Sequence, residues 1–223
     1  MSQAPSFDEE MKEWVVTKLR KGDKDALIID NWYNKDEMKK VFTELDYYMN
    51  NGLDNLIRSE NDNSSAKDEK GNSKVKSYRF YIKRDKYSVL YKYNRKYAHN
   101  EFINMLENET IFGGYMCNTH CNSMMVNYYE NDKYYKSHRD VSVVTQLTWL
   151  YREPKMFDGG DLILTDMDEK IECKNNRTIF FPGHYNHEVT EVIMKDEWER
   201  EYKEKEYYGR FSIANFFYAN YRD

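Results

Sequence analysis

Three side chains in the second half of the chain have the types and spacing of metal ligands. His138 and Asp140 are two residues apart, so on an extended backbone their side chains point to the same face. His187 opens the β-branched run HEVTEVI and can supply a third ligand from another strand. Two imidazoles and one carboxylate on one side of an ion leave three coordination positions open for small molecules.

A second histidine competes for the third position. His184 lies shortly before His187 in the segment GHYNH. It follows Pro182-Gly183, which is typical of a turn, whereas His187 begins a strand. The sequence therefore favours His187. A single histidine would more often be a hydrogen-bonded structural residue, so the prediction depends on the whole set.

Arg210 and Ser212 form another pair with a spacing of two, within the strand-like run GRFSIANFFYA. Their side chains are expected on one face of that strand. A guanidinium binds a carboxylate in a bidentate manner, and a neighbouring hydroxyl adds a further hydrogen bond. The pair is therefore suited to a buried carboxylate ligand.

Around these residues the chain resembles the Fe(II)- and 2-oxoglutarate-dependent dioxygenases, and among them the prolyl hydroxylases. The resemblance covers about Met124 to Tyr218. It rests on three motifs in order, H-R-D at 138–140, H-E-V at 187–189 and R-F-S at 210–212. Smaller matches are Tyr128 and Tyr135 before H-R-D, and the pair Gly159-Gly160 before a strand.

The resemblance implies a role for each motif residue. His138, Asp140 and His187 would bind Fe(II), and Arg210 with Ser212 would bind the distal carboxylate of 2-oxoglutarate. Further cosubstrate contacts implied in the same way are Tyr128, Tyr135, Thr145 and Trp149.

The activity implied is hydroxylation of a C–H bond, with O2 and 2-oxoglutarate consumed and succinate and CO2 released. Ascorbate is a candidate reductant. The leading substrate is a protein or peptide side chain, with a peptidyl proline first. One alternative is a free amino acid or small metabolite, and a second is a non-catalytic jelly-roll binding domain.

Two departures from the family pattern concern loops and not ligands. The spacing from His187 to Arg210 is longer than usual, because the charged run Lys195–Glu206 intervenes. We expect this run to be a solvated insertion. Asp132 also stands where many prolyl hydroxylases have glycine, so the turn there is expected to differ.

The elements that must position these residues are mostly short strands. From about Val75 the chain is rich in aromatic and β-branched residues, and Lys74–Ile82 and Tyr87–Tyr93 are predicted to form a hairpin. A short helix at 100–107 is followed by six strand-like runs separated by turn residues. The predicted fold is mainly β with flanking N-terminal helices, around a double-stranded β-helix, or cupin-like jelly roll.

The N-terminal third is predicted to be helical. One helix is expected over Phe7–Leu19, and another after Asn34, which with Glu37 forms a capping box. Residues 59–73 are polar without periodicity and predict a mobile loop. The expected organisation is an N-terminal helical support region over 1–74 and a catalytic core over 75–223, in one compact domain.

Composition excludes several other classes. The net charge of −5 gives a nucleic acid little to bind, and nucleic-acid demethylases of this fold usually carry a second arginine where Phe216 stands. H-R-D also begins the kinase catalytic loop, but the sequence that follows does not match it. No signal peptide, apolar span or cysteine framework is apparent, so we expect a cytoplasmic protein without membrane or nucleic-acid partners. The sequence does not predict an oligomeric state.

Overall fold

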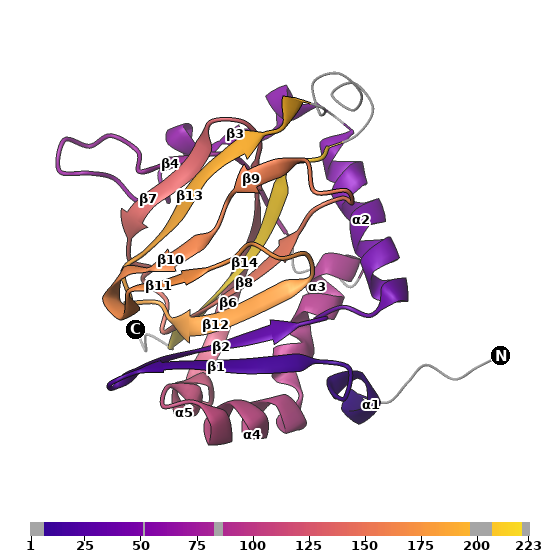
Figure 1. The fold of residues 1–223 in the computed structure, drawn as a ribbon, viewed down its shortest axis with the longest axis vertical. Helices are drawn as coiled ribbons and strands as arrows, with labels where there is room; N and C mark the ends of the chain where they lie inside the picture. Colours follow the sequence, from indigo (N-terminus) through magenta and orange to yellow (C-terminus); the bar gives the residue numbers. More distant parts are fainter. Residues whose placement is uncertain (1–6, 51, 83–86, 197–206, 220–223) are drawn as a thin grey trace.

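The computed structural model describes residues 7–50, 52–82, 87–196 and 207–219 as two facing β-sheets with helices on one side. The larger sheet has eight strands in the order β1-β2-β12-β8-β14-β6-β5-β3. The smaller has the order β11-β10-β13-β7-β4, with β9 also pairing with β13. Figure 1 shows the smaller sheet in front of the larger one. The predicted mainly β, jelly-roll fold is confirmed.

The strands are short and their pairings are antiparallel. Their bounds are β1 Val15–Lys21, β2 Lys24–Asp30, β3 Ile57–Arg58, β4 Val75–Lys76, β5 Tyr78–Tyr81, β6 Thr119–Tyr129, β7 Lys133–His138, β8 Val144–Leu150, β9 Phe157–Gly159, β10 Leu162–Leu164, β11 Glu169–Ile171, β12 Arg177–Pro182, β13 His187–Met194 and β14 Arg210–Ala219.

The larger sheet is buried on both faces, and alternation along its strands divides the core in two. In β14, Phe211 and Ile213 point to the helices, whereas Arg210, Ser212 and Ala214 belong to the face between the sheets. A strand places successive side chains on opposite faces. The same strand therefore contributes to the helix-packed core and presents polar groups to the inter-sheet space.

Five helices accompany the strands in the part of the chain that the structure describes: α1 Phe7–Met11, α2 Lys35–Met49, α3 Val89–Asn94, α4 Asn100–Glu109 and α5 Gly113–Met116. The apolar face of α2, with Val41, Leu45 and Met49, is buried against the larger sheet. None of the described helices is long and apolar enough to span a membrane.

The capping box predicted at Asn34 is confirmed. The Asn34 side chain accepts hydrogen bonds from the backbone N–H groups of Asp36 and Glu37, and the Glu37 carboxylate accepts one from the Asn34 N–H. These contacts satisfy N–H groups that a helix start leaves unpaired. The helix predicted at 100–107 is also confirmed, as α4.

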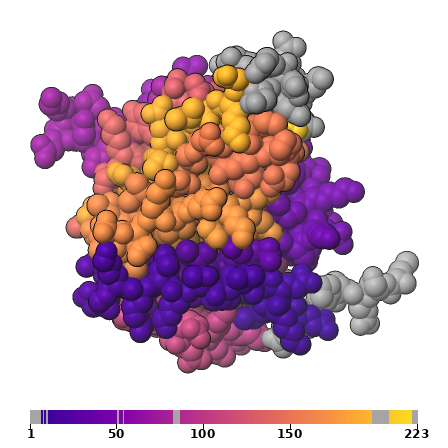
Figure 2. All heavy atoms as spheres, in the orientation of Figure 1, coloured from indigo at the N-terminus to yellow at the C-terminus, as the bar shows by residue number. Residues whose placement is uncertain are grey.

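The helix predicted over Phe7–Leu19 is wrong beyond Met11. Val15–Lys21 instead pairs with the apolar strand β2, through a two-residue turn at Gly22-Asp23. Gly22 has a φ of 62°, which suits the tight turn of a hairpin. The hairpin forms one edge of the larger sheet, and Figure 2 shows it as an indigo band across the lower part of the molecule.

The hairpin predicted from Lys74–Ile82 and Tyr87–Tyr93 is also wrong. β4 and β5 lie within the first run, but they belong to different sheets, pairing with β7 and β6. The second run contains helix α3. Ser88 begins this helix by accepting a hydrogen bond from the Tyr91 N–H, and this cap outweighs the strand preference of the aromatic residues.

The polar segment 59–73 has two parts. Residues 59–66 pack onto the sheet: Ser59 and Ser65 are buried, and the Ser59 hydroxyl donates to the Ser77 carbonyl. Residues 67–73 form a small exposed turn, closed by a bridge between Lys67 and Ser73. This part projects from the side of the molecule in Figures 1 and 2. The first part is therefore packed against the rest of the fold, and the mobility of this segment stays a prediction. Of the charged run Lys195–Glu206, residues 197–206 lie outside the described residues.

A buried ion pair joins helix α2 to the segment after α3. The Lys96 ammonium lies 2.6 Å from the Glu37 carboxylate and 3.0 Å from the Trp32 carbonyl oxygen. Replacing Lys96→Met would leave the buried Glu37 carboxylate without this cation. We expect a loss of about 3 kcal/mol in the free energy of unfolding, measured by urea denaturation. The exposed Lys39→Met is the matched control, and equal stability of the two variants would contradict the prediction.

Candidate active site

His138, Asp140 and His187 come together between the sheets. Their ligand atoms all lie within 4.8 Å of one another. The Nε2 atoms of His138 and His187 are 3.7 Å and 3.5 Å from the two Asp140 carboxylate oxygens. His138 ends β7 and is paired with His187 at the start of β13. His184, the rival ligand, is exposed in the preceding turn and is not part of this group.

Backbone carbonyls determine which nitrogen of each imidazole faces the group. The Nδ1 of His138 is 2.9 Å from the Lys136 carbonyl oxygen, and the Nδ1 of His187 is 2.9 Å from that of Tyr185. A carbonyl only accepts hydrogen bonds, so in the neutral ring each Nδ1 carries the proton. The Nε2 lone pairs are thereby directed to the space beside Asp140, as metal binding requires.

Asp140 is positioned by side-chain and backbone contacts. Its carboxylate accepts a 2.6 Å hydrogen bond from the Thr145 hydroxyl, which is also 2.8 Å from the Ser142 hydroxyl. Its backbone N–H donates to the Gly183 carbonyl. A Cβ at Gly183 would lie 2.2 Å from the Ser142 carbonyl oxygen, so glycine is needed where this turn approaches the Asp140 loop.

Burial dominates the electrostatics of the group. It lowers the pKa of His138 to about 2, with the neighbouring His187 adding to the effect. Burial also raises the pKa of Asp140, although His187 and Thr145 act in the opposite direction. The imidazole of His138 is therefore neutral and able to coordinate at neutral pH. A divalent cation would favour the ionised form of Asp140.

A cavity of about 270 Å³ opens at this group. Its lining includes all three candidate ligands, Tyr135 and Ser212. The Tyr135 ring stacks on the His138 ring with centroids 3.5 Å apart. Lining residues that are exposed mark the mouth of the cavity; they are Ser64, Tyr81, Ser123, Arg139 and Val141.

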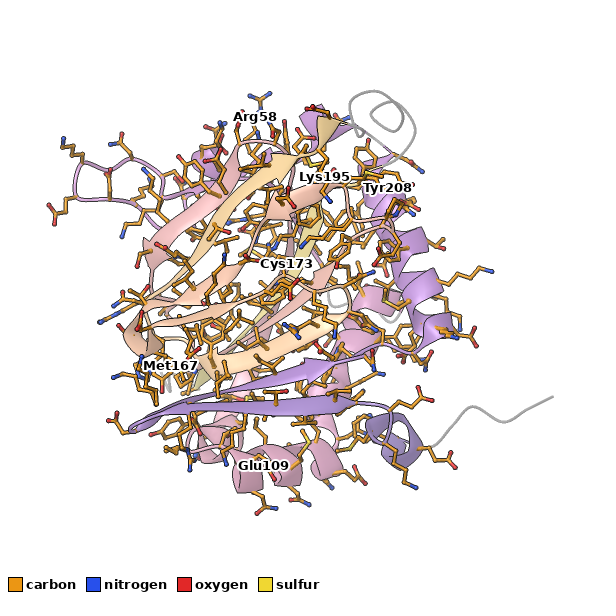
Figure 3. All side chains as sticks on the ribbon, viewed as in Figure 1. Arg58, Glu109, Met167, Cys173, Lys195 and Tyr208 are labelled. Atoms are coloured by element: carbon orange, nitrogen blue, oxygen red, sulfur yellow. The ribbon has the colours of Figure 1, made fainter. Side chains whose placement is uncertain are left out.

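Arg210 is fully buried next to the lining of this cavity. Its guanidinium carbon is 5.0 Å from the Tyr129 ring centroid and 5.4 Å from that of Trp149. Its three guanidinium nitrogens have no hydrogen-bond partner within the described structure. The thiol of Cys173, near the centre of the view in Figure 3, is also buried. Burial raises the pKa of this thiol, and the Arg210 cation offsets part of that rise. A buried cation without an acceptor is unfavourable, so this site fits an anionic ligand.

The predicted cosubstrate contacts occupy different places. Ser212 and Tyr135 line the cavity. Thr145 does not line it but contacts Asp140, and Trp149 packs on Arg210.

Tyr128 is a correction to the prediction. It is not part of the cavity lining but lies in the helix-side core, where its hydroxyl accepts from the Gly209 N–H. The neighbouring Tyr129 takes the predicted place. The register of the sheet explains this, because Tyr129 pairs directly with Arg210 and shares its face.

Sequence reasoning also missed Arg79 and Asn127, which line the cavity from β5 and β6. Arg79 pairs with Asn127, which pairs with Ser212. The alternation of side chains along the run KSYRFYI would have placed Arg79 and Tyr81 on the same face of a strand. It would not have shown which strands lie beside it.

Comparison with known proteins agrees with this site. Residues 124–218 match the model of the 2OG-Fe(II) oxygenase superfamily. The matched span contains His138, Asp140, His187, Arg210 and Ser212, so the candidate site lies within the region that resembles this superfamily. None of the curated proteins matches this chain in sequence.

Solved structures share the fold of this chain at low identity. A prolyl-4-hydroxylase from Pseudomonas putida is 12% identical with a TM-score of 0.56, over 95% of this chain and 96% of that one. A prolyl hydroxylase from Trichoplax adhaerens, in complex with a peptide fragment of the hypoxia inducible factor, is 15% identical with a TM-score of 0.54, over 87% and 83%. A viral collagen prolyl hydroxylase from Paramecium Bursaria Chlorella virus-1, in a 2-oxoglutarate complex, is 15% identical with a TM-score of 0.51, over 86% and 94%.

The superfamily implies Fe(II), 2-oxoglutarate and O2, and the residues present fit these groups. The His-Asp-His group has the donors of a facial iron site with open positions. The unpartnered guanidinium of Arg210 fits the distal carboxylate of 2-oxoglutarate.

Gly160 leaves the space that Arg210 occupies. It has a φ of 70°, and a Cβ there would lie 2.7 Å from the Arg210 Cδ. We expect Gly160→Ala to lower the free energy of unfolding by roughly 1–3 kcal/mol, because both the backbone and the contact become strained. Gly114→Ala is the control, since a Cβ at Gly114 meets nothing within 4 Å. Urea denaturation showing no difference between the two would contradict this packing.

Proposed function

We propose that this 2OG-Fe(II) oxygenase hydroxylates a C–H bond of a protein or peptide side chain, with a peptidyl proline as the first candidate. The observation that carries the proposal is one shielded site that combines a complete His-Asp-His group with an unpartnered buried arginine. A binding domain without activity would not need both. The peptide bound to the Trichoplax adhaerens enzyme supports a peptide substrate.

In this proposal, His138, His187 and Asp140 bind Fe(II) through Nε2, Nε2 and a carboxylate oxygen. The bound iron and cosubstrate supply the oxidative chemistry. The Lys136 and Tyr185 carbonyls keep the two imidazoles in the coordinating tautomer. These contacts fix the metal site before substrate binds.

The remaining site residues would bind and orient the cosubstrate. Arg210 donates to the distal carboxylate of 2-oxoglutarate, with Ser212 on the same face of β14. The rings of Tyr129 and Trp149 shield this ion pair from water, which strengthens it. The fully buried Arg210 defines the closed end of the site, and the exposed lining residues define the end at which a substrate enters.

The proposal is tested by succinate formation from 2-oxoglutarate. Anaerobically purified protein is given Fe(II) and ascorbate, then O2, with and without a panel of capped proline-containing peptides. We expect slow turnover that a peptide accelerates. Acceleration by free amino acids and not by peptides would assign a metabolite substrate. No turnover and no Fe(II)-dependent binding of 2-oxoglutarate would leave a non-catalytic jelly-roll domain.

The three ligands can be tested against the rival histidine. We expect Asp140→Ala and His138→Ala to abolish Fe(II)-dependent succinate formation, because each removes one of three metal ligands. His184→Ala should retain the activity, since His184 lies outside the group. Circular dichroism and thermal unfolding check that each variant is folded. Activity in Asp140→Ala, or its loss in His184→Ala, would refute the assignment.

Arg210 can be tested through ligand-induced stabilisation. In the wild type, 2-oxoglutarate with a redox-inert divalent metal should raise the Tm. Arg210→Met should weaken 2-oxoglutarate binding by roughly 30-fold or more, since a buried charge pair is lost. This substitution should not lower the Tm of the ligand-free protein, because the replaced cation has no hydrogen-bond partner among the described residues. An unchanged Kd in isothermal titration calorimetry would refute the role of Arg210.

A further inference from the structure

A second buried arginine lines the cavity on the side of β5. Arg79 is 1% exposed. Its Nε donates to the Asn127 side-chain oxygen at 2.8 Å, and its Nη1 donates to the Asp62 carboxylate and the Ser65 hydroxyl, each at 3.0 Å. Its Nη2 has no hydrogen-bond partner in the part of the chain that the structure describes. The two N–H donors of this buried Nη2 are therefore unpaired, on a residue that lines the cavity.

Arg79 differs from Arg210 in its charge balance. Asp62 already compensates the Arg79 charge, and their atoms are 3.0 Å apart. Burial lowers the pKa of Arg79, but Asp62, Tyr129 and Tyr135 together outweigh it and the net shift is upward, so the guanidinium stays protonated. Arg210 has no such carboxylate among the residues that the structure describes. A second anion at Nη2 would lie close to Asp62, whereas a neutral carbonyl would satisfy the donors without adding charge.

The position of Arg79 makes it a wall residue of the substrate site. β5, β6 and β14 place Arg79, Asn127 and Ser212 in one row across the sheet. Arg210 lies two residues from Ser212 along β14, towards the closed end. Tyr81, two residues beyond Arg79 on the same face of β5, lines the mouth. Arg79 therefore lies between the cosubstrate end and the entrance.

The segment before β4 holds this arginine rigidly. Asp62 also accepts hydrogen bonds from the Tyr81 hydroxyl at 2.6 Å and from the Ser64 N–H at 2.8 Å. Ser65 donates to the Ser59 carbonyl, and both serines are buried. A donor with a fixed position loses little conformational entropy when it binds a ligand.

We propose that Arg79 is a substrate-binding residue whose Nη2 donates hydrogen bonds to a neutral carbonyl oxygen of the substrate backbone. The inference rests on the proposed function, because it names a contact that selects a peptide for that same site. Asp62 positions Arg79: it fixes the guanidinium, and it compensates the positive charge that would otherwise favour an acidic ligand.

The test compares Arg79→Lys with Arg177→Lys. Both variants keep the positive charge beside an aspartate. Arg177, however, lies on β12 and pairs with Asp30 on β2, and neither residue lines the cavity. The probes are capped, uncharged proline-containing pentapeptides, the same peptides with an added glutamate, and free proline. Peptide-stimulated succinate formation gives kcat and KM, and calorimetry gives the Kd of 2-oxoglutarate.

We expect Arg79→Lys to raise the KM of the uncharged peptide about tenfold or more. The Kd of 2-oxoglutarate should stay as in the wild type, which a purely structural role would not predict. Arg177→Lys should leave the peptide KM unchanged. Asp62→Asn should shift the preference towards the glutamate-containing peptide, because the Arg79 charge is then uncompensated.

Three results would overturn this role. The first is an unchanged peptide KM in Arg79→Lys, and the second is a preference of the wild type for the acidic peptide. The third is wild-type protein that binds 2-oxoglutarate but whose turnover is stimulated by free proline, or by none of the probes. Failure of the proposed function is a different result: wild-type protein that neither binds 2-oxoglutarate nor turns it over.

Discussion

The site is organised around charged and polar groups buried between two β-sheets. In water-excluded surroundings each such group needs a partner, and hydrogen bonds there are stronger than in solvent. Arg79, Asp140 and His138 have partners from the protein. Arg210 has none among the described residues. The same burial that stabilises the fold therefore leaves one cation without an acceptor among the described residues.

The sheets supply this arrangement through their alternation. Strand β14 packs Phe211 and Ile213 against the helices and presents Arg210 and Ser212 to the interior. β7 and β13 bring two histidines to the same level by pairing His138 with His187. Backbone carbonyls then select the tautomer of both rings. The two strands thus position both candidate histidines, whereas Asp140 lies in the loop after β7 and is held there by Thr145 and Gly183.

The surroundings of the two buried arginines determine which kind of ligand each of them suits. Arg210 lies between aromatic rings without a carboxylate and is suited to an anion. Arg79 lies beside Asp62, so this pair has no net charge while the guanidinium still offers hydrogen-bond donors. The segment that carries Asp62 is packed through buried serines. A short polar stretch of sequence thereby becomes part of the cavity wall.

Sequence by itself predicted the candidate ligand set. The spacing of two in H-R-D and R-F-S is a local property of an extended strand, whereas His187 was predicted as the start of a separate strand. The sequence also determined the capping box at Asn34, whose contacts span one helical turn. The tertiary structure decided that Tyr129 and not Tyr128 accompanies Arg210, and that residues 15–21 form a strand. Both depend on pairing with distant partners, since register fixes which of two adjacent side chains faces inward. The place of Arg79 was decided in the same way, because Asp62, Asn127 and Ser212 meet it only once the strands are assembled.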